Sequence, residues 1–125
     1  MITVDQYLRQ HAKIWPTSVQ DAATALIPKV NALLADPDCP SPDADLRSGY
    51  RPPDFNAGVK GAAPNSKHQT GHAVDLNDND EALDNWLTDA ILTQYGLWRE
   101  SPDATVSWCH VQDLPPNSGK RTFHP

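Results

Sequence analysis

Residues 65–78, NSKHQTGHAVDLND, join a turn that contains one glycine to a stretch in which polar and apolar side chains alternate. In an extended chain Val74 and Leu76 point to one side and Asp75 to the other. This alternation predicts a half-buried strand over residues 72–77. Asp75 is therefore expected on the face opposite the apolar one, where a polar side chain could bind a ligand.

His68 and Asp75 could bind one metal ion only if the chain doubles back between them. Seven residues of strand span ~23 Å, whereas zinc holds nitrogen and oxygen ligands at ~2.0 to 2.2 Å. Gly71 is placed to allow a turn over residues 69–71 that brings His68 onto the polar face of the strand. His110, on a later predicted strand, could add a third ligand. Two imidazoles and one carboxylate leave a position for water, as in catalytic zinc sites.

A simpler interpretation remains open, in which the same residues form a polar turn between two strands and bind nothing. Five histidines and a larger number of aspartates allow many such triads in a chain of this length. Spacing alone therefore does not single out this set of ligands.

Helices are predicted on both sides of this strand from apolar spacing and from capping residues. They are Val4–His11 capped by Thr3, a second helix capped by Thr17 or Ser18 that runs to Ala35, and Glu81–Gln94 capped by Asp78 and Asp80. Pro28 falls inside the second pattern, so we expect that helix to be kinked or divided there. A helical turn is also possible over Phe55–Val59.

Further strands are predicted where short apolar or alternating runs are bounded by turn residues. They are Leu46–Ser48, Leu97–Arg99 and Thr105–Val111. Residues 36–45 and 115–125 are rich in proline and are expected to be irregular. The order of elements predicts one α+β domain over residues 1–125, in which helices pack on a mainly antiparallel sheet. Residues 1–45 would be helical support and loop, and residues 46–114 would be the core that carries the metal site.

Composition excludes several classes of function. The formal net charge is −6 and the basic residues are scattered, so a nucleic-acid partner is not expected. No apolar run approaches the ~20 residues that a bilayer requires, so we expect a soluble chain. We also expect the protein to be a monomer. The first residues lack the basic and apolar segments of a signal peptide, which predicts synthesis in the cytoplasm without one. Cys39 and Cys109 are expected to be reduced thiols.

Three motifs occur in order along the chain: Ser48-Gly-Tyr-Arg51, then Ser66-x-His68-x-x-Gly71-x-Ala73-x-Asp75, then Trp108-x-His110. Together they resemble the motifs of the zinc D-alanyl-D-alanine carboxypeptidases and the phage L-alanyl-D-glutamate endopeptidases. The resemblance extends from about Leu46 to the last strand.

The resemblance implies a fold shared with the hedgehog signalling domain and a Zn²⁺ ion bound by His68, Asp75 and His110. It also implies that Arg51 contacts a substrate carboxylate or polarises the scissile carbonyl. The substrate would be the stem peptide of bacterial peptidoglycan, cut by zinc-activated water. Because no signal peptide is predicted, the protein would act at the cell wall after release through a lesion made by another protein.

One position departs from the pattern of that family. Several of its members have an acidic residue three positions before the last histidine, where it serves as general base. Here that position is Ser107, whose hydroxyl cannot take a proton from water at neutral pH. Glu100 is the preferred replacement and Asp103 the second choice. The alternative is a hedgehog-like zinc domain without catalysis, which binds cell wall or a protein partner.

The remaining histidines, Cys109 and Trp108 are not expected to bind the metal. His72 lies beside the motif and could hydrogen-bond a substrate or a ligand residue, but it is expected to be an exposed histidine at a strand edge. His11 and His124 are expected to be surface residues. Strand alternation points Cys109 away from His110, whereas Trp108 is expected in the core or packed beside His110.

Overall fold

A five-stranded sheet with the order β1-β2-β4-β3-β5 forms the centre of the computed structural model, which describes residues 1–125. The strands are β1 Leu46–Ser48, β2 Ala73–Asn77, β3 Trp98–Glu100, β4 Trp108–Gln112 and β5 Thr122–Phe123. All neighbouring strands are antiparallel except β3 and β5, which are parallel. The predicted single α+β domain with a mainly antiparallel sheet is therefore confirmed.

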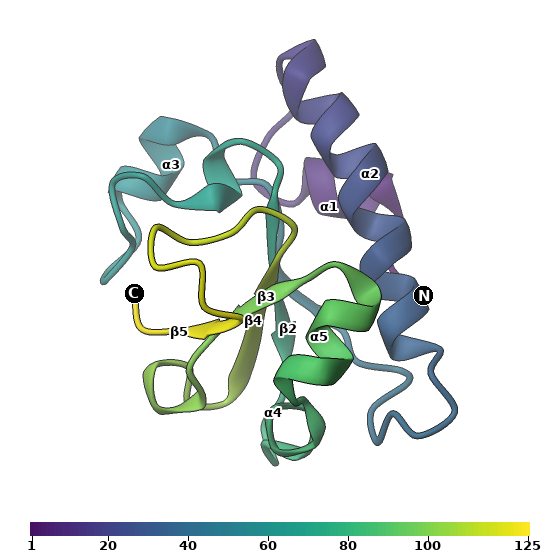
Figure 1. Cartoon of the computed structure of the whole chain (residues 1–125). Helices are drawn as coiled ribbons and strands as arrows, with labels where there is room; N and C mark the ends of the chain where they lie inside the picture. Colours follow the sequence, from purple (N-terminus) through teal and green to yellow (C-terminus); the bar gives the residue numbers. More distant parts are fainter.

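Five helices and two 3₁₀ turns complete the chain. They are α1 Val4–Arg9, α2 Thr17–Leu34, α3 Pro53–Ala57, η1 Lys67–Gln69, α4 Ala82–Trp86, α5 Asp89–Tyr95 and η2 Pro102–Ala104. The long helix α2 lies along one side of the sheet, whereas α3 and the C-terminal segment lie on the other side (Figure 1). No helix combines the length and the apolar character needed to cross a membrane.

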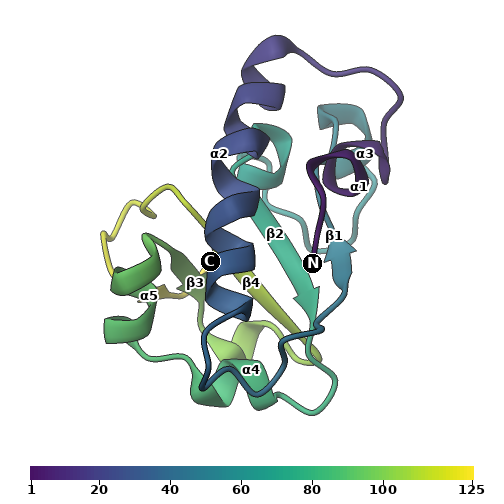
Figure 2. The same ribbon diagram turned by 90° about the vertical axis from the view of Figure 1, so that its right-hand side faces the viewer.

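The hydrophobic core lies between α2 and the sheet (Figure 2). Val74 and Leu76 of β2 and Val111 of β4 have no exposed surface and belong to this core. Cys109 is also fully buried there, so its side chain points away from His110 as strand alternation predicted. The opposite face of β2 and β4 is left for polar side chains.

The helix α2 is continuous through Pro28, so it is not divided there, while the alternative of a kink stays a prediction. A proline inside a helix costs about 3 kcal/mol or more. Leu26, Ile27 and Val30 around it are almost completely buried, and each such side chain contributes roughly 1.5 to 3 kcal/mol. Packing of the helix on the sheet therefore outweighs the local penalty.

The single helix predicted over residues 81–94 is also wrong, because α4 and α5 are separate helices. Leu87 takes an extended conformation between them, and the Thr88 hydroxyl accepts the N–H of Ile91 to cap the second helix. Leu87 is nevertheless buried in the core with Leu83 and Leu92. The apolar spacing continues across the break because the linker and both helices face the same core.

Two further predictions at the C-terminal end are corrected. The last antiparallel strand begins at Trp108 and not at Thr105, and Val106 before it is 64% exposed. The tail was expected to be irregular, yet Thr122 and Phe123 form β5 beside β3. Arg99 N donates to Arg121 O and Ser101 N donates to Phe123 O, which holds the tail in place.

Candidate metal centre

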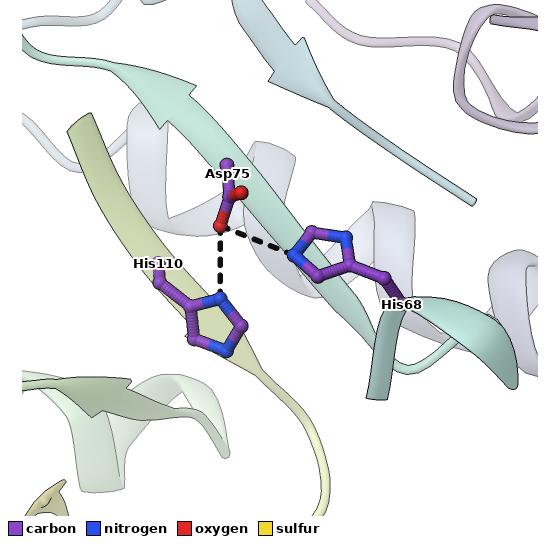
Figure 3. Close-up of side chains that lie close together, drawn as sticks. All are labelled: His68, Asp75 and His110. Atoms are coloured by element: carbon purple, nitrogen blue, oxygen red, sulfur yellow. Dashed lines mark hydrogen bonds and ion pairs between the residues drawn. The ribbon is translucent and has the colours of Figure 1, made fainter. Parts of the chain in front are cut away.

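Three buried side chains converge on the polar face of the sheet (Figure 3). Asp75 lies in the middle of β2, His110 faces it from β4, and His68 comes from the 3₁₀ turn η1. Potential ligand atoms of the three residues all lie within 4.8 Å of one another. The structure thus brings together the predicted triad, which could hold a metal ion.

The turn that places His68 depends on Gly71, as predicted. Gly71 has a φ of +84°, a left-handed conformation that favours glycine. A Cβ atom there would lie 2.8 Å from the carbonyl oxygen of Val19 in α2. Ser66 accepts the backbone N–H of His68 and so begins the turn. The sharp turn lets the chain return from His68 to the start of β2.

The imidazole of His68 is held in one orientation. Its Nδ1 lies 2.8 Å from the carbonyl oxygen of Gly49, which can only accept, so Nδ1 carries the hydrogen. The other nitrogen, Nε2, is buried without a hydrogen-bond partner and lies 3.2 Å from Oδ1 of Asp75. A buried lone pair beside a carboxylate oxygen is an unfavourable arrangement unless a cation lies near both. The donor set therefore fits a metal ion.

The imidazole of His110 lies on the other side of the same carboxylate oxygen. Its Nδ1 is 2.8 Å from Oδ1 of Asp75, and its Nε2 is 2.9 Å from Oε1 of Gln112. The ring of Phe123 packs edge-on against it with centroids 6.4 Å apart. A residue of the tail, and not Trp108, is thus the aromatic that covers His110.

The electrostatics of the cluster favour an ionised carboxyl and a protonated histidine. Burial opposes the charge on Asp75, but electrostatic interaction with the two imidazoles and the hydrogen bond from His110 hold the pKa of this carboxyl well below its usual range. Burial also opposes the charge on His110, yet its hydrogen bond to Asp75 and the nearby carboxylates raise the pKa of His110 to about 9. The metal-free cluster therefore holds a proton where a cation could bind.

Arg51 lies directly behind the carboxyl group of Asp75. Its Nη2 donates to Oδ2 of Asp75 at 3.0 Å, its Nε donates to Ser48 Oγ at 3.0 Å, and its Nη1 donates to Asn56 Oδ1 at 3.4 Å. The guanidinium is buried, so it neutralises and orients this carboxyl group. Contact between Arg51 and a substrate stays a prediction.

Glu100 is the acidic side chain beside the cluster. It ends β3, its Oε1 lies 3.8 Å from His110 Nδ1, and its side chain is 22% exposed. Asp103 instead pairs with His124, and both of these side chains are largely exposed. The structure therefore places the preferred candidate base near the triad and its rival at the surface.

Ser107, at the position where related motifs carry an acid, faces another part of the molecule. Its hydroxyl accepts from Arg47 at 3.1 Å, and its backbone has a φ of +75°. It makes no contact with the triad.

The remaining histidines lie outside the cluster. His72 is not the exposed residue that was expected, because it is half-buried with its Nδ1 2.9 Å from Oδ1 of Asp113. His11 is half-buried and stacks on Phe55 with ring centroids 4.0 Å apart, whereas His124 lies at the surface as expected.

Helix α1 supports the loop that carries Gly49 and Arg51, a role that sequence reasoning did not assign to named residues. The backbone carbonyl of Tyr7 accepts the N–H of Tyr50 at 3.0 Å, and the Tyr7 hydroxyl donates to Ala73 O at 2.7 Å. Gln10 accepts the N–H of Gly49 at 2.7 Å. A Cβ atom at Gly49 would lie 2.4 Å from Tyr7 O, so only glycine allows this close approach.

Gln112 and Asn56 were also missed. Gln112 follows His110 by two residues on a strand, so alternation could have placed both on one face. Asn56 carries no such signal, although it follows Arg51 by only five residues.

No family model, no curated protein and no solved structure matches this chain.

Proposed function

We propose that this protein is a zinc metallopeptidase that cleaves an amide bond in the stem peptide of bacterial peptidoglycan. The observation that carries the proposal is the buried convergence of His68, Asp75 and His110, with the Nε2 lone pair of His68 left without a partner. The three ordered motifs that resemble zinc D-alanyl-D-alanine carboxypeptidases and phage endopeptidases supply the substrate class and a hedgehog-like fold.

Zinc is the proposed metal because of the donor set. Two imidazole nitrogens and one carboxylate oxygen are the ligands of many catalytic zinc sites, in which the fourth position stays open. Calcium and magnesium prefer oxygen ligands only. Gly49 and Gln112 each contact the outer nitrogen of one histidine, as second-sphere groups do at metal sites.

When bound, zinc would polarise the scissile carbonyl and lower the pKa of water towards ~7. Glu100 accepts the proton of the attacking water on Oε1 and delivers it to the leaving amine. Arg51 orients Asp75 through its hydrogen bond to Oδ2 and steadies negative charge on the substrate oxygen as the tetrahedral intermediate forms. The partial exposure of Glu100 allows it to reach a bound peptide, whereas the triad itself is buried.

The first test is metal content after purification, with His68→Ala as the control variant. The wild type should retain about one zinc per chain and the variant much less, while equal zinc in both proteins would exclude His68 as a ligand. The second test incubates purified peptidoglycan with the zinc-loaded protein and measures newly released amino groups. Mass spectra of the products then distinguish an internal cut in the stem peptide from loss of terminal D-alanine.

A second candidate is a zinc domain that binds cell wall or a protein partner without hydrolysis. The position of Ser107, remote from the triad and hydrogen-bonded to Arg47, favours it because the usual acid of the related motifs is absent. Retained zinc with no release of amino groups under any divalent ion would support this candidate. Sedimentation of the protein with insoluble peptidoglycan would then identify the wall as its partner.

A further inference from the structure

The two histidines of the cluster present different ring nitrogens to Asp75. A histidine can bind a metal through either nitrogen, and the hydrogen bond made by the other nitrogen selects between them. His68 turns Nε2 inward because its Nδ1 bonds to Gly49 O. His110 turns Nδ1 inward instead. Some feature of the chain must therefore set the ring of His110 the opposite way.

The side chain of Gln112 lies where it can set the orientation of the His110 ring. Its Oε1 lies 2.9 Å from Nε2 of His110, and its own amide nitrogen lies 2.7 Å from the carbonyl oxygen of Leu114. A carbonyl oxygen only accepts, so the amide nitrogen of Gln112 must face Leu114 and the amide oxygen must face His110. That oxygen also only accepts, so Nε2 of His110 carries the hydrogen.

The backbone around Gln112 leaves this side chain little freedom. Gln112 is opposite Ala73 of β2 on one side and opposite Trp98 of β3 on the other, so its strand is paired on both edges. The residue is 4% exposed, and burial removes competition from water for either hydrogen bond. The amide group is thus a fixed acceptor for the imidazole.

We propose that Gln112 is a positioning residue that selects Nδ1 of His110 as the metal-binding atom, an inference that rests on the proposed metal site. Gln112 acts only through His110. With the amide oxygen bonded to Nε2–H, the lone pair that remains on a neutral His110 is on Nδ1, directed at the cluster. Without that acceptor, Nε2 becomes an alternative ligand atom and the ring can turn.

The test uses the full chain labelled with ¹⁵N-histidine and loaded with ¹¹³Cd, which stands in for zinc and is detected by NMR. In the wild type, one-bond coupling to cadmium should appear at Nδ1 of His110 and at Nε2 of His68. In Gln112→Leu, coupling at Nδ1 of His110 should weaken or move to Nε2, and zinc affinity should fall about 10- to 100-fold.

Gln112→Glu is the matched variant, because its carboxylate keeps an acceptor for His110 but loses the donation to Leu114. It should retain coupling at Nδ1 and zinc affinity within about tenfold of wild type. Equal losses in both variants would show that Gln112 acts through Leu114 and the strand end, which would overturn the proposal. Unchanged coupling and affinity in Gln112→Leu would overturn it as well.

If Gln112→Leu does not fold, the wild-type spectrum still tests the ligand atom, because coupling at Nε2 of His110 contradicts the proposal and coupling at Nδ1 supports it. Peptidoglycan cleavage is measured separately. Nδ1 coupling without cleavage would refute the peptidase function and leave this inference intact. Cleavage by a Gln112→Leu protein with unchanged zinc affinity would refute only the inference.

Discussion

Asp75 and His110 face each other directly across two antiparallel strands, and Oδ1 of Asp75 lies 2.8 Å from Nδ1 of His110. The same oxygen is 3.2 Å from Nε2 of His68, while Oδ2 is bound by Arg51. One carboxyl group thus connects both histidines and the arginine. Because all three side chains contact this carboxyl group, the role of each can be tested by substituting it alone.

Glu100 is expected to be the general base. Glu100→Gln keeps the size of the side chain but cannot accept a proton, so hydrolysis of peptidoglycan should fall by roughly 10²-fold or more, since general-base catalysis contributes about that much. Zinc content should be unchanged, because Glu100 is not a member of the triad. Asp103→Asn is the control, and activity should remain because Asp103 pairs with His124 at the surface. A reversed pattern would assign the base to Asp103.

Zinc affinity should depend on pH because a metal ion and a proton compete for His110. The pKa of His110 is raised to about 9 in the metal-free protein, so the residue is protonated at pH 7 and must lose that proton when metal binds. Apparent affinity should therefore rise about tenfold per pH unit from pH 7 towards 9 and then level off. Competition with a chromogenic chelator, corrected for its own protonation, measures this. A constant affinity over that range would show that His110 is not a ligand.

Gly71 should be intolerant of a side chain. Gly71→Ala would force an L-residue to a φ of +84° and bring its Cβ to 2.8 Å from Val19 O. The free energy of unfolding should fall by about 2 kcal/mol or more, measured with urea, since the strained backbone alone costs of order 1 to 3 kcal/mol. Gly61→Ala is the matched control, because Gly61 has a φ of +78° and nothing near its missing Cβ. Equal losses in both variants would show that contact with α2 contributes nothing.

Arg51 should not be replaceable by lysine. The guanidinium contacts Ser48, Asn56 and Asp75 with three different nitrogens, whereas the three donors of an ammonium group all lie on one nitrogen. Arg51→Lys should reduce the free energy of unfolding of the metal-free protein by about 1 to 3 kcal/mol, since buried polar groups lose partners. Arg9→Lys is the control at an exposed position and should change it by less than about 0.5 kcal/mol. An unchanged free energy of unfolding in Arg51→Lys would contradict the role of Arg51 in orienting Asp75.

The sequence predicted the position of Asp75 because strand alternation is a local rule. Val74 and Leu76 are fully buried in the core while Asp75 faces the histidines, as the period of two requires. The turn at Gly71 followed from a second local rule, since glycine is favoured at a positive φ. These two rules place His68 on the side of the strand that carries Asp75, whereas the choice of His68, Asp75 and His110 as ligands rested on the resemblance of the three motifs.

Features that depend on distant segments were not predictable in the same way. The break at Leu87 leaves the apolar spacing of residues 81–94 unchanged, because Leu87 stays in the core after the helix ends. Strand β5 has two residues, and only its pairing with β3 makes it a strand. The orientation of Gln112 depends on the Leu114 carbonyl, whose direction no residue pattern records.

The hydrogen bonds made by α1 and Gln10 determine whether a shortened chain could still bind metal. A shortened chain that starts at β1 would keep all three proposed ligands, Arg51 and Glu100. It would lose the Tyr7 carbonyl that receives Tyr50 N, the Tyr7 hydroxyl on Ala73 and the Gln10 side chain on Gly49. The carbonyl that holds His68 would then be free to shift, so trimming to the motif-bearing part would yield a protein that has every ligand and binds metal poorly.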